Sequence, residues 1–194
     1  WGFNYQGMLG QGNTTNRSSP VQIGSETNWS KVFDRYYNTG SIKTDGTLWA
    51  WGNNGYGRLG LGDTTNRSSP TQVGALTNWS KIAARAYNGA AIKTDGSLWV
   101  WGNNSWGQLG LSHQNNMSFI SKIDSLYNWA NIACGTNYSA AIKTDGTIWA
   151  WGNNSFGQLG QNNYVHISSP VQVGGINNYV SVYCLNQTTM AELV

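Results

Sequence analysis

The chain has 194 residues, of which 25 are glycine and 11 are tryptophan, and only 10% carry a charged side chain. The tryptophans supply large apolar area for burial, so this composition argues against disorder. The net charge of +3 is too small to indicate a nucleic-acid partner. No apolar run approaches the roughly 20 residues of a membrane helix, so membrane insertion is not expected.

A repeat with a period of 50 residues runs through the whole chain. The same Trp-Gly phrase opens each copy, at Trp1, Trp51, Trp101 and Trp151. A fixed period of this kind indicates one supersecondary unit that is copied and stacked. We therefore interpret residues 1–194 as one domain segment with four copies, of which the last is incomplete: 1–50, 51–100, 101–150 and 151–194.

The second copy shows the predicted elements of one unit. Short, partly alternating apolar runs predict strands at 70–73, 79–85, 90–94 and 97–101. The segment from Gly52 to Pro70 is rich in Gly, Asn, Ser and Thr, which is typical of a long structured loop. No stretch has helical periodicity. Four short antiparallel strands per copy predict an all-β fold built from propeller blades.

Two recurring features of each copy carry specific structural predictions. An Asp-Gly pair between two strand-like runs favours a tight hairpin turn, because glycine adopts positive φ at little cost. These pairs stand at Asp45-Gly46, Asp95-Gly96 and Asp145-Gly146. The tryptophan beside a glycine, once per copy, predicts packing between blades rather than a ligand platform. We therefore expect Trp51, Trp101 and Trp151 to be buried.

The third copy departs from the shared pattern near its fourth strand. It has Ile120 where the other copies have proline, and Asp124 where they have glycine. Because both replaced residues are turn formers, we expect the long loop of this copy to have a different shape.

Several phrases together resemble the regulator of chromosome condensation repeat. They occur at 61–70, 132–135, 140–146 and 149–160, and the last of them reads WAWGNNSFGQLG. The resemblance covers essentially the whole chain and is closer to the bacterial and phage branch of the family. It implies a β-propeller of about seven blades, so that these four copies are part of a larger ring.

The fold by itself does not determine the function. The resembling family includes a nucleotide exchange factor, a secreted β-lactamase inhibitor, and surface and virion proteins. We interpret the chain as a non-catalytic structural or binding module of a phage virion (tail or capsid-associated) or a bacterial surface. Its expected partner is a protein or a host-surface glycan. The alternative is a dedicated protein-binding propeller, such as an enzyme inhibitor or a guanine-nucleotide exchange factor-like regulator, and a cytoplasmic location stays open.

The sequence contains no recognisable combination of catalytic residues. His113 and His166 are the only histidines, and neither has a carboxylate or cysteine at metal-ligand spacing. Three of the acids belong to the Asp-Gly turns, and the others form no acid–base pair. We therefore expect no enzyme activity, no cofactor and no metal. Cys134 and Cys184 are interpreted as free buried thiols, with a disulfide as the alternative.

Aromatic residues at one loop position are the first candidate for a partner-binding surface. The sixth position of each copy holds Gln6, Tyr56, Trp106 and Phe156 in turn. Exposed aromatic side chains commonly anchor recognition. The alternative is that the rings fold back over the blade edge. His113 and His166 join the candidates, because loops 111–119 and 161–167 differ most from the shared sequence.

Basic residues at repeated positions are the second candidate. Residues 1–100 hold nine of the eleven lysines and arginines. Equivalent positions on neighbouring blades predict a modest basic stripe, and ordinary solvated surface charge is the alternative. The stripe consists of Arg17, Arg67, Lys31, Lys81, Arg35 and Arg85.

The number of copies predicts that the chain is not a free-standing monomer. An unclosed propeller leaves strand edges and an apolar blade face uncovered, and both invite association. We expect a longer polypeptide or an assembly that covers both ends. Met190, Leu193 and Val194, in the atypical last copy, are the expected contact surface at the C-terminal side.

Overall fold

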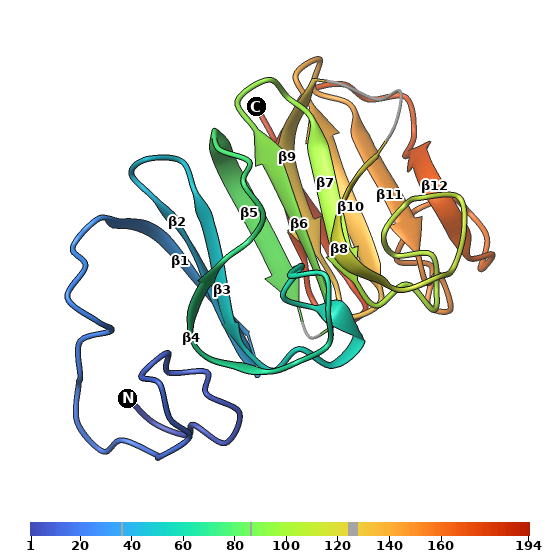
Figure 1. Ribbon diagram of the computed structural model, residues 1–194. Coiled ribbons are helices and arrows are strands. Elements are labelled where there is room, and N and C mark those ends of the chain that lie inside the picture. The colour runs from blue at the N-terminus through green and yellow to red at the C-terminus, as the bar shows by residue number, and fades with distance from the viewer. Residues whose placement is uncertain (36, 86, 124–127) are drawn as a thin grey trace.

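The computed structural model of the protein describes residues 1–35, 37–85, 87–123 and 128–194. It consists of three four-stranded antiparallel sheets and one two-stranded sheet. The sheets follow one another along the chain and stand side by side, from blue to red in Figure 1. Within the described residues, the one helical element is the short 3-10 turn η1 (Gly55–Gly57). The all-β fold of four-stranded antiparallel blades is therefore confirmed.

Strand order within every sheet equals chain order, so each strand pairs with its sequence neighbour. The first blade contains β1 (Trp29–Arg35), β2 (Asn38–Lys43), β3 (Leu48–Gly52) and β4 (Arg67–Gln72). The second contains β5 (Trp79–Arg85), β6 (Asn88–Lys93), β7 (Leu98–Gly102) and β8 (Met117–Lys122). The third contains β9 (Trp129–Cys134), β10 (Tyr138–Lys143), β11 (Ile148–Gly152) and β12 (Ile167–Gln172). The two-stranded sheet contains β13 (Tyr179–Cys184) and β14 (Thr189–Leu193).

Neighbouring blades contact one another through the inner strands. β5 lies against β1, β9 lies against β5 and β6, and β13 lies against β9 and β10. The fourth strand is the outer edge of each blade and comes from the next 50-residue copy, as in the pairing of Trp49 with Gln72. Adjoining copies are therefore joined by a β-ladder as well as by packing. Pro70 lies in this edge strand, where a missing backbone donor costs least.

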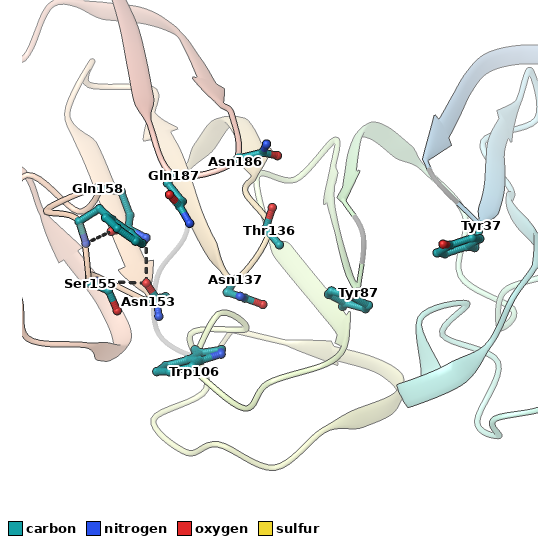
Figure 2. Close-up of a pocket in the computed structure, with 11 residues that line it drawn as sticks. Tyr37, Tyr87, Trp106, Thr136, Asn137, Asn153, Ser155, Gln158, Asn186 and Gln187 are labelled. Carbon is teal, nitrogen blue, oxygen red and sulfur yellow. Dashed lines mark hydrogen bonds between the residues drawn. The ribbon is translucent and has the colours of Figure 1, made fainter.

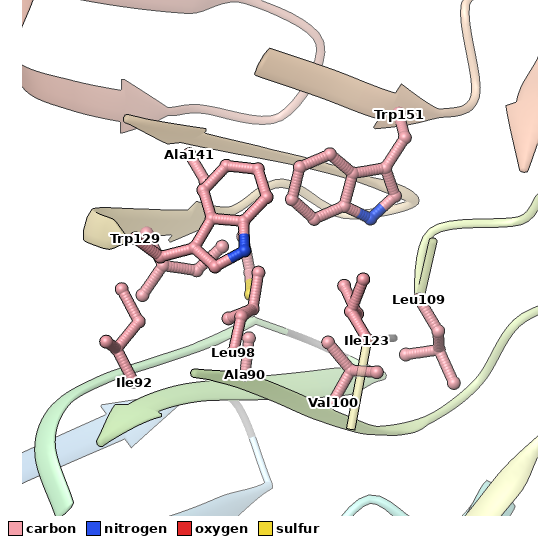
Figure 3. Close-up of a cluster of buried hydrophobic side chains, with 11 residues drawn as sticks. Ala90, Ile92, Leu98, Val100, Leu109, Ile123, Trp129, Ala141 and Trp151 are labelled. Atoms are coloured by element: carbon pink, nitrogen blue, oxygen red, sulfur yellow. The ribbon is translucent and has the colours of Figure 1, made fainter. Parts of the chain in front are cut away.

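The core consists of apolar layers between successive blades. Figure 3 shows one layer, in which Leu98 and Val100 of β7 face Trp129 and Trp151 of the following blade. The three predicted core tryptophans are buried, with exposed fractions of 1% for Trp51, 2% for Trp101 and 0% for Trp151. Their predicted role in blade packing is confirmed.

Each of these indoles also binds the loop of the preceding copy. The Nε1 of Trp51 donates to the carbonyl of Met8, 43 residues earlier, at 2.9 Å. Trp101 donates to Arg58 and Trp151 to Gln108 at the same distance and the same sequence separation. The hydrogen bond satisfies the polar atom of a ring that is otherwise enclosed by apolar groups.

The Asp-Gly pairs form the predicted hairpin turns. Gly46 has φ +78° and its amide donates to the carbonyl of Lys43 at 3.0 Å. Thr47 donates from its hydroxyl and its amide to Asp45, and these hydrogen bonds hold the pKa of Asp45 below its usual value. A Cβ on Gly46 would lie 2.8 Å from the backbone nitrogen of Asn78, so the next blade also requires glycine here.

The expectation of a differently shaped loop in the third copy is wrong. Strand β8 occupies the same positions as β4 and β12, with Ile120 at the place of the proline. Ile120 packs against the apolar layer between the first two blades. The loop keeps its shape because its internal hydrogen bonds, described below, use residues that the third copy retains. Asp124 lies outside the described residues.

The described residues include no helix that is both long and apolar enough to span a membrane.

We predict that Trp101→Phe lowers the free energy of unfolding by about 2 to 3 kcal/mol, because it leaves the Arg58 carbonyl without its donor and opens a void between blades. Trp106→Phe is the matched control, since Trp106 is 38% exposed. Urea denaturation followed by circular dichroism measures both variants. Equal stability of the two variants would contradict the assigned role of the indole.

Candidate binding face

A buried asparagine organises the long loop of every copy. The side chains of Asn54, Asn104 and Asn154 are fully buried. Each Oδ1 accepts from the backbone amide five residues later, at 2.9 Å, and each Nδ2 donates to the carbonyl nine residues later. Side-chain hydrogen bonds of this kind replace the ladder bonds that a loop lacks. The loops are therefore built on one frame although their sequences differ.

A glutamine fixes the aromatic position in the third and fourth copies. Gln108 Oε1 accepts from the backbone amide of Trp106 at 2.9 Å, while its Nε2 donates to Asn103 at 2.6 Å. Gln158 binds Phe156 and Asn153 in the same way, at 2.9 Å each. These bonds hold the backbone of both aromatic residues against a rigid support.

The second copy has Arg58 in place of this glutamine. Its guanidinium lies 5.0 Å from the ring centre of Tyr87 and 5.9 Å from that of Tyr56, within the range of cation–π contacts. Burial lowers the pKa of Arg58 from its ordinary value. Tyr56 adopts φ +64°, a strained conformation for a residue other than glycine.

The three aromatic candidates point outward. The exposed fraction is 52% for Tyr56, 38% for Trp106 and 63% for Phe156. Trp106 is supported by His166, whose ring lies edge-on at 4.8 Å between centres. The structure therefore brings two of the predicted candidates, Trp106 and His166, into contact. That these rings bind a partner stays a prediction.

A cavity of about 620 Å³ opens beside Trp106 and Phe156 (Figure 2). Tyr56 does not line it and instead lies edge-on against Tyr87, 6.1 Å between ring centres. The lining comes from the long loops and from the turns that follow the first strand of each blade. It consists of Tyr37, Tyr87, Trp106, Thr136, Asn137, Asn153, Ser155, Phe156, Gln158, Asn186 and Gln187. We call these residues together with Tyr56 the loop face.

Nine of the eleven lining residues were not predicted from the sequence, which indicated only Trp106 and Phe156. Tyr37, Tyr87, Asn137 and Gln187 occupy one repeated position in the four copies. The signal that identifies them is a repeated position filled by large polar or aromatic residues just before a buried second strand. Among the described residues that line the cavity there is no Asp, Glu, Lys, Arg or His. Its chemistry is that of amides, hydroxyls and aromatic rings.

Both histidines have structural contacts in the loop frame. His113 Nδ1 accepts from the backbone amide of Asn115 at 3.2 Å, in place of the aspartate or asparagine of other copies. His166 Nδ1 accepts from the amide of Asn154 at 2.9 Å. Among the described residues there is no group of three or more His, Cys, Asp or Glu side chains that is able to hold a metal.

Five of the six residues of the predicted basic stripe are engaged in contacts within the protein. Lys31 Nζ donates to the Ser80 carbonyl of the next blade at 2.5 Å, and Lys81 makes the equivalent contact with Ala130. Arg85 donates to the carbonyl of Cys184 at 2.7 Å. Arg17 binds Gln11 at 2.9 Å, and Arg67 pairs with Asp63 at 2.6 Å. The side chain of Arg35 lies outside the described part of the structure, and the stripe itself stays a prediction.

Cys134 and Cys184 are buried thiols outside any disulfide, as predicted. Their thiols lie 3.6 Å from backbone carbonyls of the preceding blade, Cys134 from Ala83 and Cys184 from Ala133. Burial raises the pKa of Cys184 to about 12, so this thiol stays protonated and unreactive at neutral pH.

The blades, the repeated interblade contacts and the loop face together define a segment of a β-propeller. Comparison with protein families agrees with this class. The regulator of chromosome condensation (RCC1) repeat matches residues 45–92, 95–142 and 145–191, and a second description of the same repeat matches residues 129–158. The chain belongs to the RCC1 repeat family.

Solved structures of propellers are similar to the chain throughout its length. Prp20p from Saccharomyces cerevisiae has 16% identity and a TM-score of 0.81, over 98% of this chain and 50% of that one. Yeast RCC1 (Prp20) bound to Kap60 has 16% identity and a TM-score of 0.86, over 100% and 49%. Human WBSCR16 has 18% identity and a TM-score of 0.59, over 97% and 65%. The chain thus spans about half of the yeast structures, and likeness at this identity shows the fold alone. No curated protein sequence matches the chain.

We predict that His166→Ala lowers the free energy of unfolding by about 1 to 2 kcal/mol, because the buried amide of Asn154 loses its acceptor. His166→Asn restores the stability, since Asn116 accepts from the amide of Asn104 at 2.8 Å in the preceding copy. Chemical denaturation compares the two variants. If both lose the same stability, the hydrogen bond is not what His166 contributes.

Proposed function

We propose that the chain is a non-catalytic binding module that recognises a partner protein through the loop face. The observation that carries this proposal is the set of outward-pointing aromatic rings held on a fixed hydrogen-bonded frame beside a cavity. Rigid aromatic side chains lose little conformational freedom on binding, which makes them effective anchors. The described part of the cavity lining offers hydrogen bonds and ring surfaces but no charged acid or base for proton transfer.

The similar structures support a protein partner. Yeast Prp20p is described with its binding to Gsp1p and histones, and a second structure has it bound to Kap60. A regulator of the exchange-factor or enzyme-inhibitor kind is accordingly the second candidate for this chain. The two candidate functions differ in location, because a regulator acts on an intracellular or secreted enzyme, whereas a surface module acts at a virion or cell surface.

We further propose that the module functions in a phage virion or at a bacterial surface. The support is the bacterial and phage type of its repeats and the polar, weakly charged surface. In that case, peptides from residues 45–191 are recovered from purified virions, or from intact cells labelled with a membrane-impermeant reagent. Mass spectrometry measures this recovery. Recovery from the cytoplasmic fraction alone would favour the regulator instead.

We predict that the combined replacement Tyr56→Ala, Trp106→Ala and Phe156→Ala abolishes partner capture. Stability should change by less than about 1 kcal/mol, because exposed side chains contribute little to folding. Immobilised wild-type and variant chains are compared on extracts of the native source, and retained proteins are identified by mass spectrometry. Phe119→Ala is the control, since this ring is 55% exposed but does not line the cavity. A strong loss of stability with unchanged capture would show that the three rings are core residues.

A further inference from the structure

We propose that the cavity of the loop face is a subsite for an uncharged saccharide. This inference rests on the proposed function of the face and specifies what its concave part takes. The volume of about 620 Å³ lies within the ~300–1,000 Å³ that small-molecule sites commonly have.

The aromatic side of the cavity fits the C–H face of a sugar ring. Trp106, Tyr87 and Phe156 line the cavity and are 38%, 37% and 63% exposed. The face of an aromatic ring carries partial negative charge, and the axial C–H groups of a pyranose carry partial positive charge. A pyranose ring therefore packs on an indole or phenyl surface without the desolvation of a charged group.

The polar side of the cavity fits the hydroxyls of the same ring. Asn137 and Gln187 line it, and their side-chain amides make no hydrogen bond within the described part of the chain. Each amide offers a donor and an acceptor, which matches a hydroxyl that both donates and accepts. Asn153 and Gln158 are bonded to each other at 2.9 Å and provide a fixed floor. Figure 2 shows Asn137 and Gln187 on the same side of Tyr87 as Trp106.

The arrangement follows from one repeated position. In successive copies it holds Tyr37, Tyr87, Asn137 and Gln187, so aromatic residues precede amides around the cavity. The change from ring to amide occurs between the second and third copies, next to Trp106.

The absence of charge in the lining selects a neutral ligand. The guanidinium of Arg85 contacts the lining residue Asn186, but it is bound to the Cys184 carbonyl and to Asn186 Oδ1, at 2.7 and 2.5 Å. A charged ligand would lose hydration without gaining an opposite charge. A proline-rich peptide would use the aromatic surface but leave the amides without partners.

The test measures binding of the full chain to neutral oligosaccharides by saturation-transfer NMR and titration calorimetry. The probes are N-acetyllactosamine, mannotriose, cellotriose and maltotriose, with sialyllactose, glucose 6-phosphate and a proline-rich peptide as alternatives. We expect at least one neutral probe to bind, with saturation transferred to its ring C–H protons. Trp106→Ala and Asn137→Ala should each weaken binding at least tenfold. Phe119→Ala is the matched control, with unchanged affinity, because this ring is 55% exposed and does not line the cavity.

Three outcomes overturn the inference: none of the neutral probes binds, binding is unaffected by Trp106→Ala, or a charged probe or the peptide binds more tightly. A fourth outcome also overturns the saccharide subsite: partner capture requires Trp106 but survives enzymatic deglycosylation of the partner. In that case the proposed protein-binding function stands. Conversely, saccharide binding at Trp106 with undiminished protein capture by the triple variant supports the subsite and contradicts the protein-binding function. Competition identifies the source of the sugar. If glycopeptides of the partner inhibit binding of the probe, the sugar belongs to the partner protein, and if host polysaccharide inhibits it, the sugar belongs to the host surface.

Discussion

The structure depends on one contact that joins each copy to the one before it. The indole of Trp101 fills the layer between two blades, and its Nε1 donates to the Arg58 carbonyl at 2.9 Å. The same ring therefore stabilises the apolar layer and anchors the middle of the preceding loop. Because Trp51 and Trp151 repeat the contact, the loops are held by the packing of the blades. In a repeat protein whose successive units pack on one another, such interfaces contribute a large share of the stability.

A loop that is anchored in this way can change its exposed residues without losing its shape. The asparagine frame binds backbone amides and carbonyls, so it places few demands on the side chains between them. Where the frame does use a side chain, substitutes with the same acceptor suffice, as His166 shows by taking the place of asparagine. The aromatic position can therefore hold Tyr56, Trp106 or Phe156 on one scaffold. This separation of frame from variable positions is what a recognition surface requires.

The sequence allowed the blades to be predicted because their determinants are local. Alternating apolar runs, Asp-Gly turns and the repeated tryptophans each act within one copy or between adjacent copies. The cavity was only partly predicted, since its lining converges from turns and loops of four copies. Tyr87 and Gln187 are 100 residues apart, and neither has an unusual neighbour in the sequence. The shape of the third loop was predicted wrongly because turn residues were given more weight than the backbone hydrogen bonds that fix it.

The distribution of charge follows from the same interblade contacts. Lys43 is buried with its ammonium 3.7 Å from the ring centre of Trp49 and 2.6 Å from Glu26. Lys31 binds a carbonyl of the next blade, and Arg85 binds one on β13. Cations in these positions satisfy backbone oxygens that propeller geometry leaves without ladder partners. The basic residues thus contribute to joining the blades, and the cavity of the loop face is lined without them. In the proposed function, an electrically neutral cavity with exposed rings discriminates by shape and hydrogen bonding, so that binding depends little on salt.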